Sequence, residues 1–401
     1  MIDREASRIV IAGAGVGALE GLLALQDLAQ RRLEIVLLSP SSTFEYTPLA
    51  VAEPFGLGQA HRFDLRATLR ERGVEMVISE LVGIDTEGRQ AETATGRSLR
   101  YDALLVAIGA WRRGALPGAI TFSGPRASSD VRGLLHEAGA GAVQRLVFAV
   151  PAGVTWSLPV YELALMTSAH LAERGVAAEV SVVSPEERPL LAFGSRASAA
   201  VEEMLNAREI VFRRAVPVRA EPGRLLLENA EPVAADAVVA LPKLLAPEIA
   251  GLPRDAGGFV PVDEHCRVRG LEGVYAAGDI TSFPLKQGGI ASQQADVAAE
   301  ALLADLGEAI EPTPFQPILR GLLLTGRAPR YLRAEMLSGR TARSSEASEA
   351  IWWPPAKIAG RRLGPFLALQ GVPGGPPPDA VALELDGSDA DAGRPPGTPS
   401  R

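Results

Sequence analysis

The feature that most constrains the fold is a glycine turn near the N-terminus, which joins an apolar strand to a helix. The strand is expected at residues 8–12, and the turn after it has the spacing G-x-G-x-x-A, formed by Gly13, Gly15 and Ala18. Gly13 permits the tight turn, Gly15 lets a pyrophosphate approach the backbone, and Ala18 lets the helix pack near the strand. The helix N-terminus offers amide donors and a positive dipole to phosphates. We therefore interpret the turn as a dinucleotide-binding site rather than a plain connection between strand and helix.

A second stretch, at residues 273–281, is another apolar strand, and it ends in Gly278 and Asp279. One glycine turn alone would be a weak signal, but the two stretches in this order and separation are typical of one cofactor site. The usual acidic residue about 20 positions after the glycine turn is replaced by Ser39, at the end of the strand expected at 34–38. A serine can still make one hydrogen bond to a ribose, although without the charge assistance of a carboxylate.

The composition limits the kind of protein this can be. The 401 residues are 47% hydrophobic and 22% charged, which is enough to bury two sizeable cores. A net charge of −8 argues against nucleic acid as a principal partner. Residues 1–5 lead straight into the first strand and leave no room for a signal peptide, and no apolar run approaches the ~20 residues of a membrane span. We expect a cytoplasmic protein, at most in peripheral contact with the inner membrane face, and a homodimer stays open.

The single cysteine, Cys266, excludes an intramolecular disulfide and therefore a redox-active cysteine pair. It lies in the polar stretch 262–268, which indicates a turn between strands, so we expect an incidental surface thiol rather than a nucleophile. The four histidines are scattered without metal-binding spacing, and we expect no metal site.

Strand and helix patterns alternate in two separate parts of the chain, which is typical of parallel sheets with crossover helices. The first part is expected to comprise strand 8–12, helix 17–30, strand 34–38, a hairpin-like region at 74–99 and strand 102–109. A linker, Leu116-Pro117-Gly118, precedes the second part, which is expected to comprise strand 145–150, helix 157–174 and strand 178–183.

The chain must return to the first sheet near Gly258, because the strand that ends at Asp279 belongs there. We therefore predict an α/β fold with two doubly wound Rossmann-like nucleotide-binding domains, the second inserted in the first, plus a C-terminal segment. The predicted parts are a first domain at 1–118 and 258–312, a degenerate second domain at 119–257, a C-terminal segment at 313–370, and a disordered Gly/Pro/Asp-rich tail at 371–401.

Residues 8–370 resemble a flavoprotein of the pyridine nucleotide–disulfide oxidoreductase superfamily, in the branch that holds sulfide:quinone oxidoreductases and type II NADH dehydrogenases. The resemblance rests on the glycine turn, the strand 104–109 ahead of Pro117-Gly118, and the stretch 274–279. The loop at 44–48, the helix start at 286–289 and the segment around Lys357 add to it.

The resemblance implies that FAD is bound in an extended form, with Asp279 holding its ribityl or pyrophosphate portion. It also implies that a helix opening at 288–290 points its N-terminus at the N1–C2=O edge of the flavin, where a positive dipole stabilises the anionic reduced ring. Lys286 would add a full charge there, unless it is a solvated surface lysine. The other positions that the resemblance assigns to the cofactor are Pro48 beside the isoalloxazine ring, Val82 at the adenine, and Gly109, Gly278, Gly289 and Ile290.

The second domain departs from the family pattern where NAD(P)H would bind. Only Gly153 remains of a second glycine motif, and Trp156 and Pro159 crowd the place where a pyrophosphate would approach. NAD(P)H binding stays open but is disfavoured, and a vestigial site is the favoured interpretation. Glu162 matches a glutamate that relatives place toward the flavin, where it could relay protons to N5, or it is a buried structural carboxylate.

The C-terminal stretch 351–363 resembles the part that covers the flavin in quinone-reducing relatives. Trp352 or Trp353 could stack on a planar quinone with Lys357 near a reducible carbonyl, or the aromatic rings could pack at a domain interface. Residues 357–369 could form an interfacial amphipathic helix or a helix docked on the core.

Three functions remain open. Paired cysteines are lacking, so sulfide oxidation by the thiol route is excluded. The favoured function is an FAD-dependent oxidoreductase that passes electrons from a small-molecule donor to a quinone-like acceptor. The alternatives are an NAD(P)H-dependent flavoprotein reductase with a protein or small-molecule acceptor, and a non-catalytic flavin-binding sensor or scaffold.

Overall fold

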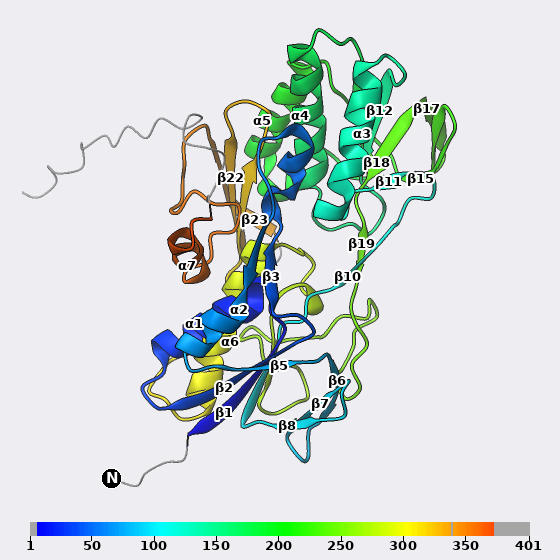
Figure 1. Ribbon diagram of the computed structural model, residues 1–401. Helices are drawn as coiled ribbons and strands as arrows, with labels where there is room; N and C mark the ends of the chain where they lie inside the picture. Colours follow the sequence, from blue (N-terminus) through cyan, green and yellow to red (C-terminus); the bar gives the residue numbers. More distant parts are fainter. Residues whose placement is uncertain (1–5, 338–339, 373–401) are drawn as a thin grey trace, which may run out of the picture.

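The computed structural model describes residues 6–337 and 340–372, and it contains two parallel five-stranded sheets. The first sheet, in the lower part of Figure 1, has the strand order β20-β9-β1-β2-β5. The predicted tail at 371–401 lies outside the described residues except for its first two positions. The strands of the first sheet are β1 (Ser7–Ala12), β2 (Leu33–Ser39), β5 (Glu75–Ile78), β9 (Ala103–Val106) and β20 (Val274–Ala276).

Both faces of the first sheet are covered, which explains why its strands are continuously apolar. On one face, Ile9 and Ile11 pack against α1 (Val16–Leu28) and α6 (Gly288–Asp305). On the other face, Val10 packs against a small antiparallel sheet and the segment 246–280. The smaller elements around this sheet are α2 (Leu65–Glu71), β6 (Leu81–Asp85), β7 (Gln90–Thr93) and β8 (Ser98–Arg100).

The second sheet, in the upper part of Figure 1, has the order β11-β18-β12-β13-β14. The chain enters and leaves this region through an antiparallel pair, β10 (Trp111–Arg113) and β19 (Lys243–Leu245). The predicted insertion of a second Rossmann-like unit into the first is thus confirmed. Its elements are β11 (Ile120–Thr121), α3 (Ser128–Gly139), β12 (Arg145–Ala149), α4 (Leu158–Glu173), β13 (Glu179–Ser184), α5 (Ser195–Asn206), β14 (Val211–Arg214) and β18 (Ala237–Ala240), with a side hairpin sheet of β15 (Pro217–Glu221), β16 (Arg224–Leu227) and β17 (Ala230–Ala234).

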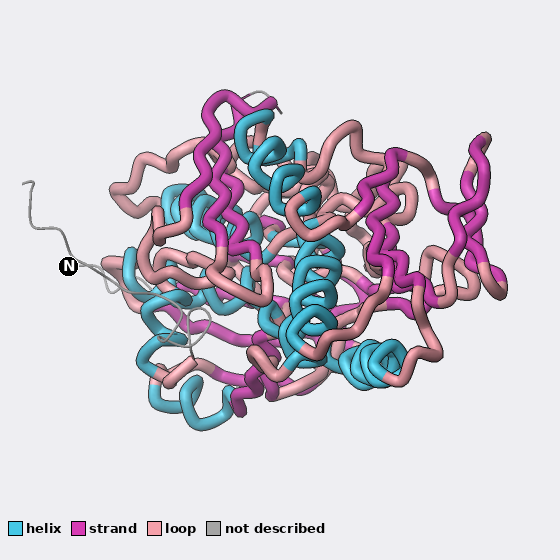
Figure 2. The backbone as a smooth tube through the Cα atoms, turned by 90° about the horizontal axis from the view of Figure 1, so that it is seen from above, coloured by secondary structure: helices cyan, strands magenta, loops and turns pink. Residues whose placement is uncertain are grey.

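The C-terminal segment forms a third, antiparallel sheet, which the sequence patterns did not predict. It contains β21 (Ile318–Leu323), β22 (Arg330–Leu337) and β23 (Arg340–Ala347) and is followed by α7 (Leu363–Leu369). Figure 2 shows the sheets as separate groups of strands with helices between them. The helix expected at 357–369, either interfacial or docked on the core, is wrong in extent, because residues 357–362 are not helical and the helix begins at Leu363. Leu363 and Leu367 are buried in the core of the first sheet, so the helix is docked on the core.

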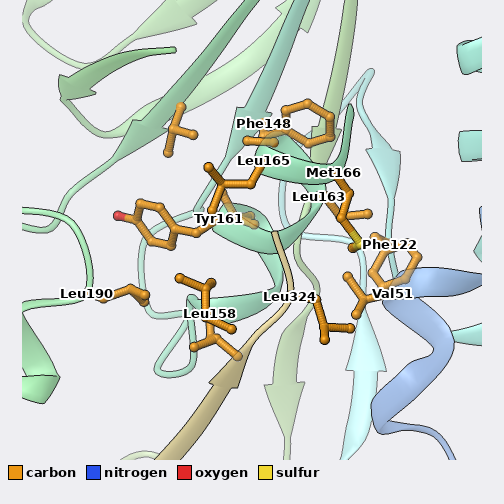
Figure 3. Packing of buried hydrophobic residues seen from close by; sticks show 14 of the residues in the cluster. Val51, Phe122, Phe148, Leu158, Tyr161, Leu163, Leu165, Met166, Leu190 and Leu324 are labelled. Carbon is orange, nitrogen blue, oxygen red and sulfur yellow. The ribbon is translucent and has the colours of Figure 1, made fainter. Parts of the chain in front are cut away.

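A segment of chain that leaves the first sheet after β2 completes the core of the second sheet. It consists of β3 (Thr43–Tyr46), the 3-10 helix η1 (Pro48–Phe55) and β4 (His61–Asp64), and η1 packs on α3 and α4. Figure 3 shows Val51 of η1 near Phe122 and Met166, with Leu324 from the C-terminal segment close by. One apolar core therefore joins residues from three distant parts of the chain.

Cys266 is not the surface thiol that the polar sequence around it predicts. It is fully buried in the core of the first sheet, and burial raises the pKa of its thiol. The carboxylate of Asp263 accepts hydrogen bonds from the amides of His265 and Arg267, both at 2.9 Å. This turn holds the polar residues near the surface and places the intervening cysteine inside.

Candidate functional site

A cavity of about 300 Å³ lies where the two parallel sheets and the C-terminal segment meet. Many parts of the chain line it: the start of η1, the connection from β20 to α6, the loop before α4 with the first turn of that helix, the β10–β19 pair with residues 241–242, residues 122–124, Phe259, and the C-terminal segment with β21. Polar and charged side chains from these parts face it, namely Arg112, Glu162, Lys243, Asp279, Lys286, Gln287, Arg320 and Lys357.

The glycine turn after β1 has the geometry that phosphate binding needs. Gly13 has φ +118°, and a Cβ there would stand 2.2 Å from the carbonyl oxygen of Ala107, so only glycine fits. At Gly15 a Cβ would meet nothing within 4 Å, so the backbone there is open to a ligand. Gly15 is the N-cap of α1 and supplies no side-chain hydrogen bond to the first turn. Ala18 is fully buried, and Ser39 ends the neighbouring strand β2.

Asp279 lies at the carboxyl end of β20, on the short 3-10 turn η4 (Gly278–Ile280), and faces the cavity. Burial raises the pKa of its carboxyl group, and the nearby charges of Lys286 and Arg112 oppose this rise. Lys286 is buried rather than solvated: its Nζ donates a hydrogen bond to the carbonyl of Thr281 and lies 3.8 Å from the centre of the Phe259 ring. Burial lowers the pKa of Lys286 to about 8.

The N-terminus of α6 reaches the cavity through a different residue from the expected ones. The side chain of Gln287, the N-cap, accepts a hydrogen bond from the amide of Ile290 at 3.0 Å. That amide is therefore satisfied within the helix, and Ile290 is a core residue. Gly288, instead of Gly289 or Ile290, lines the cavity.

A buried ion pair crosses the cavity wall from the second sheet to the C-terminal segment. Nζ of Lys357 lies 2.6 Å from both carboxylate oxygens of Glu162, and the amide of Leu324 donates to the same carboxylate at 2.8 Å. Burial raises the pKa of Glu162 and lowers the pKa of Lys357, while their mutual attraction opposes both changes. Gain or loss of one proton by this pair would leave a buried charge uncompensated.

The structure places the remaining candidate residues away from the cavity. Trp352 packs edge-on against Tyr331 at 5.1 Å and its Nε1 donates to the carbonyl of Ala356, while Trp353 is 78% exposed. Neither tryptophan lines the cavity, so the expected acceptor pocket is not assembled from them. Val82 is exposed on β6, with its carbonyl bonded to the amide of Ala250. Gly109 follows β9 with φ +72°.

The sequence did not predict three cationic residues that line the cavity, namely Arg112, Lys243 and Arg320. They come from β10, β19 and β21, which are separated by long stretches of chain. Only Arg112 had a usable signal, because it directly follows the strand and glycine that end at Gly109.

The second sheet carries a half-buried carboxylate beside the N-terminus of α4. Glu186, just after β13, accepts hydrogen bonds from the hydroxyls of Ser157 (2.9 Å), Tyr161 (2.6 Å) and Ser184 (2.9 Å). Ser157 is the N-cap of α4, so this internal anion lies at the positive end of the helix. The ring of Trp156 packs on Phe193 at 5.8 Å beside it.

Within the part of the chain that the structure describes, no group of three or more His, Cys, Asp or Glu side chains could hold a metal ion. Within residues 6–337 and 340–372, no helix has the length and apolar character needed to cross a membrane.

Comparison with known proteins points to one group of enzymes. Residues 7–300 match the model of a family described as pyridine nucleotide-disulphide oxidoreductase. A NADH dehydrogenase-like protein of Mycobacterium tuberculosis is 30% identical over 297 residues, which cover 69% of this chain and 73% of that protein. The sulfide-quinone reductase of Aquifex aeolicus is 25% identical over 300 residues, or 70% of this chain and 69% of that one. The crystal structure of the Aquifex aeolicus sulfide:quinone oxidoreductase superposes with a TM-score of 0.76 and 20% identity, covering 85% of this chain and 87% of that one.

Proposed function

Because the chain belongs to the pyridine nucleotide-disulphide oxidoreductase family, we propose that it binds FAD and passes electrons from a small-molecule donor to a quinone or similar acceptor. It is a flavin-dependent oxidoreductase related to NADH dehydrogenase-like and quinone-reducing proteins. The observation that carries the proposal is the cavity between the carboxyl end of β20, the N-terminus of α6 and the Glu162–Lys357 pair.

The residues present fit an extended FAD. The open backbone at Gly15 and the α1 N-terminus suit a pyrophosphate. The carboxylate of Asp279, which accepts no hydrogen bond from the described residues, suits a ribityl hydroxyl. Pro48, Lys286 and Gly288 would lie along the isoalloxazine ring, and Ser39 would reach the adenosine ribose. When bound, FAD supplies both two-electron and one-electron redox chemistry.

The chain's own residues would bind the partners and manage protons. Lys286 places a positive charge at the cavity edge, which favours an anionic ring. Glu162 and Lys357 both line the cavity, so this pair would act as proton acceptor and proton donor toward a ligand there. Apolar residues such as Val51, Leu322 and Ile358 form a wall that suits a planar, uncharged acceptor.

The chain has one cysteine, so the proposed electron path uses no cysteine pair. Cys266 is buried in the first core and does not line the cavity. A Cys266→Ala variant should therefore keep the rate of acceptor reduction within about twofold, whereas a thiol relay would lose its activity.

The test begins with release of the cofactor from purified protein and its identification by mass. Anaerobic stopped-flow mixing with NADH, NADPH and sulfide in parallel then shows which donor bleaches the flavin band near ~450 nm. The reduced protein is next mixed with a soluble naphthoquinone or benzoquinone, and rapid return of the band is expected. Colourless protein that does not take up FAD would overturn the cofactor assignment. Reduced flavin that quinones do not reoxidise would overturn the acceptor assignment.

A further inference from the structure

The cavity has a charge that the proposed electron-transfer chemistry does not require. Its lining carries five cationic side chains but only two acidic ones, in a protein whose net charge is −8. Lys357 is neutralised by Glu162, and Asp279 is the main attractive charge on Lys286. The remaining cations, Arg112, Lys243 and Arg320, form no salt bridge with any of the described residues.

Arg320 is the most telling of these three. It is half-buried on β21, and its Nε is buried with no hydrogen-bond partner among the described residues. Its Cα pairs with that of Arg333 on β22, and burial and the charge of Arg333 both lower the pKa of Arg320. Arg320 lines the cavity without a carboxylate partner among the described residues, so its guanidinium group offers a charge to an anionic ligand.

Lys243 and Arg112 lie on the neighbouring antiparallel pair, where Arg112 is opposite Leu244. The lysine stem runs along the loop before α4, with its Cε 3.4 Å from where a Cβ of Gly153 would stand. Nη1 of Arg112 donates to the carbonyl of Ser123, another residue of the lining, at 3.1 Å. The cations therefore border the cavity from two directions.

Apolar side chains line the cavity together with these cations, among them Phe122, Trp156, Leu158 and Leu241. An inorganic ion would leave this apolar surface uncovered, and a neutral hydrocarbon would leave the cations without a partner. A ligand with an apolar body and an acidic group satisfies both.

We propose that the part of the cavity formed by Trp156, Lys243 and Arg320 binds a small organic carboxylate with an apolar body. The carboxylate group would pair with Arg320 and Lys243, and the apolar body would lie on Trp156 and Leu158. This proposal rests on the proposed function, since it names the class of ligand that shares the cavity with FAD.

The test uses the FAD-containing full-length protein and three probes at constant ionic strength. Benzoate, benzamide and inorganic phosphate are titrated by calorimetry and by flavin difference spectra. Benzoate and benzamide have nearly the same shape, so at least tenfold tighter binding of benzoate is expected and isolates the charge. Phosphate should bind more weakly than benzoate, because it cannot cover the apolar surface. Equal binding of benzoate and benzamide, or binding of phosphate alone, would overturn the proposal.

Two variants and a matched control locate the site. Arg320→Gln should weaken benzoate binding at least tenfold, and Lys243→Gln should weaken it at least threefold. The control, Arg333→Gln, should change benzoate binding less than twofold, because Arg333 does not line the cavity. If Arg320→Gln does not fold, Lys243→Gln decides, since Lys243 is exposed on a short strand. Unchanged benzoate affinity in a folded variant would contradict the proposal. Protein without FAD would instead refute the proposed function, so the two failures are distinguishable.

Discussion

At the scale of single residues, the Glu162–Lys357 pair is the strongest local constraint on the site. Both side chains are almost fully buried, and each compensates the charge of the other across 2.6 Å. Replacing both partners of such a pair with neutral residues often costs little, whereas removing one leaves an uncompensated buried charge.

We predict that Lys357→Met lowers the free energy of unfolding by about 3–5 kcal/mol at neutral pH. The loss should shrink at lower pH, because a protonated Glu162 no longer needs a cation. The double variant Glu162→Gln/Lys357→Met should recover most of the stability. Urea unfolding measures all three proteins, with Lys243→Met as the control at an exposed lysine of the same cavity. If the free energy of unfolding of Lys357→Met lies within about 0.5 kcal/mol of the value for the parent protein, the pair is not formed.

Glu20 makes the free energy of unfolding depend on pH. It is fully buried in α1, and its two oxygens accept hydrogen bonds from the amides of Arg362 (2.6 Å) and Leu363 (3.0 Å). Burial, with a contribution from Asp296, raises its pKa from 4.5 to about 7. The folded protein thus holds this proton more tightly than the unfolded chain does. The resulting stabilisation is complete below pH 4.5 and is lost as the pH rises toward 7, an effect of about 3 kcal/mol.

We predict that Glu20→Gln flattens the fall in unfolding free energy between pH 5 and 7, whatever its effect on absolute stability. Burial also raises the pKa of the neighbouring Asp296 to about 6, so part of the slope should remain. The measurement is urea unfolding at several pH values, with the exposed Glu137→Gln on α3 as the control. A slope equal to that of the parent would exclude Glu20 as its source.

At the scale of elements, the two glycines of the turn after β1 have different roles, one in folding and the other in cofactor binding. Gly13 and Gly15 are two positions apart, but only Gly13 has a positive φ and a backbone oxygen where a Cβ would stand. Gly15 has φ −89° and open space around it. A side chain at Gly15 should therefore leave the fold intact and stand where the pyrophosphate approaches.

We predict that Gly15→Val folds normally but binds FAD at least about tenfold more weakly, a loss of about 1.4 kcal/mol. Gly13→Val should fail to fold, because its side chain would overlap the carbonyl of Ala107. The flavin-to-protein ratio and circular dichroism measure the two effects, with Gly139→Val at an open site in α3 as the control. Full flavin content in Gly15→Val would place the pyrophosphate elsewhere.

The elements that the sequence predicted are those with a continuous local signal. Strand 8–12, helix 17–30, strand 34–38 and helix 157–174 differ from β1, α1, β2 and α4 by at most two residues at either end. Both faces of a parallel sheet are buried, so its strands appear in the sequence as continuous apolar runs, each followed by a helix, and this pattern is easy to recognise. The antiparallel sheet β21–β23 was missed, because its strands mix arginine with apolar residues and pair with one another rather than with either parallel sheet.

The candidate site was only partly predictable for a related reason. Asp279, Lys286, Glu162 and Lys357 lie in recognisable stretches, and all four line the cavity. Arg320 and Lys243 reach it from strands whose position depends on how three sheets pack, and no local pattern encodes that arrangement.

At the scale of the whole molecule, the two parallel sheets have similar architecture. They differ in what surrounds the N-terminus of the helix that follows the central strand, α1 after β1 and α4 after β12. The glycine turn of the first sheet exposes its backbone to a ligand, while the N-terminus of α4 on the second lies beside the carboxylate of Glu186, which accepts hydrogen bonds from three hydroxyls. The core of the second sheet also includes Val51 of η1 and Leu324 of the C-terminal segment. The second sheet thus shares its core with segments that also line the cavity.

We predict that NADH binds the FAD-containing protein more weakly than about 1 mM, equivalent to about −4 kcal/mol, because Glu186 already provides the negative charge that the α4 N-terminus favours. Glu186→Ala should destabilise the fold by about 2–3 kcal/mol, since Ser157, Tyr161 and Ser184 lose their common acceptor. Glu187→Ala, at the exposed neighbouring position, should change stability by less than about 0.5 kcal/mol. Calorimetric titration with NADH and urea unfolding provide the two measurements. Micromolar binding of NADH together with unchanged stability of Glu186→Ala would mean that the carboxylate moves aside for the nucleotide, and the second sheet would then be a working binding site.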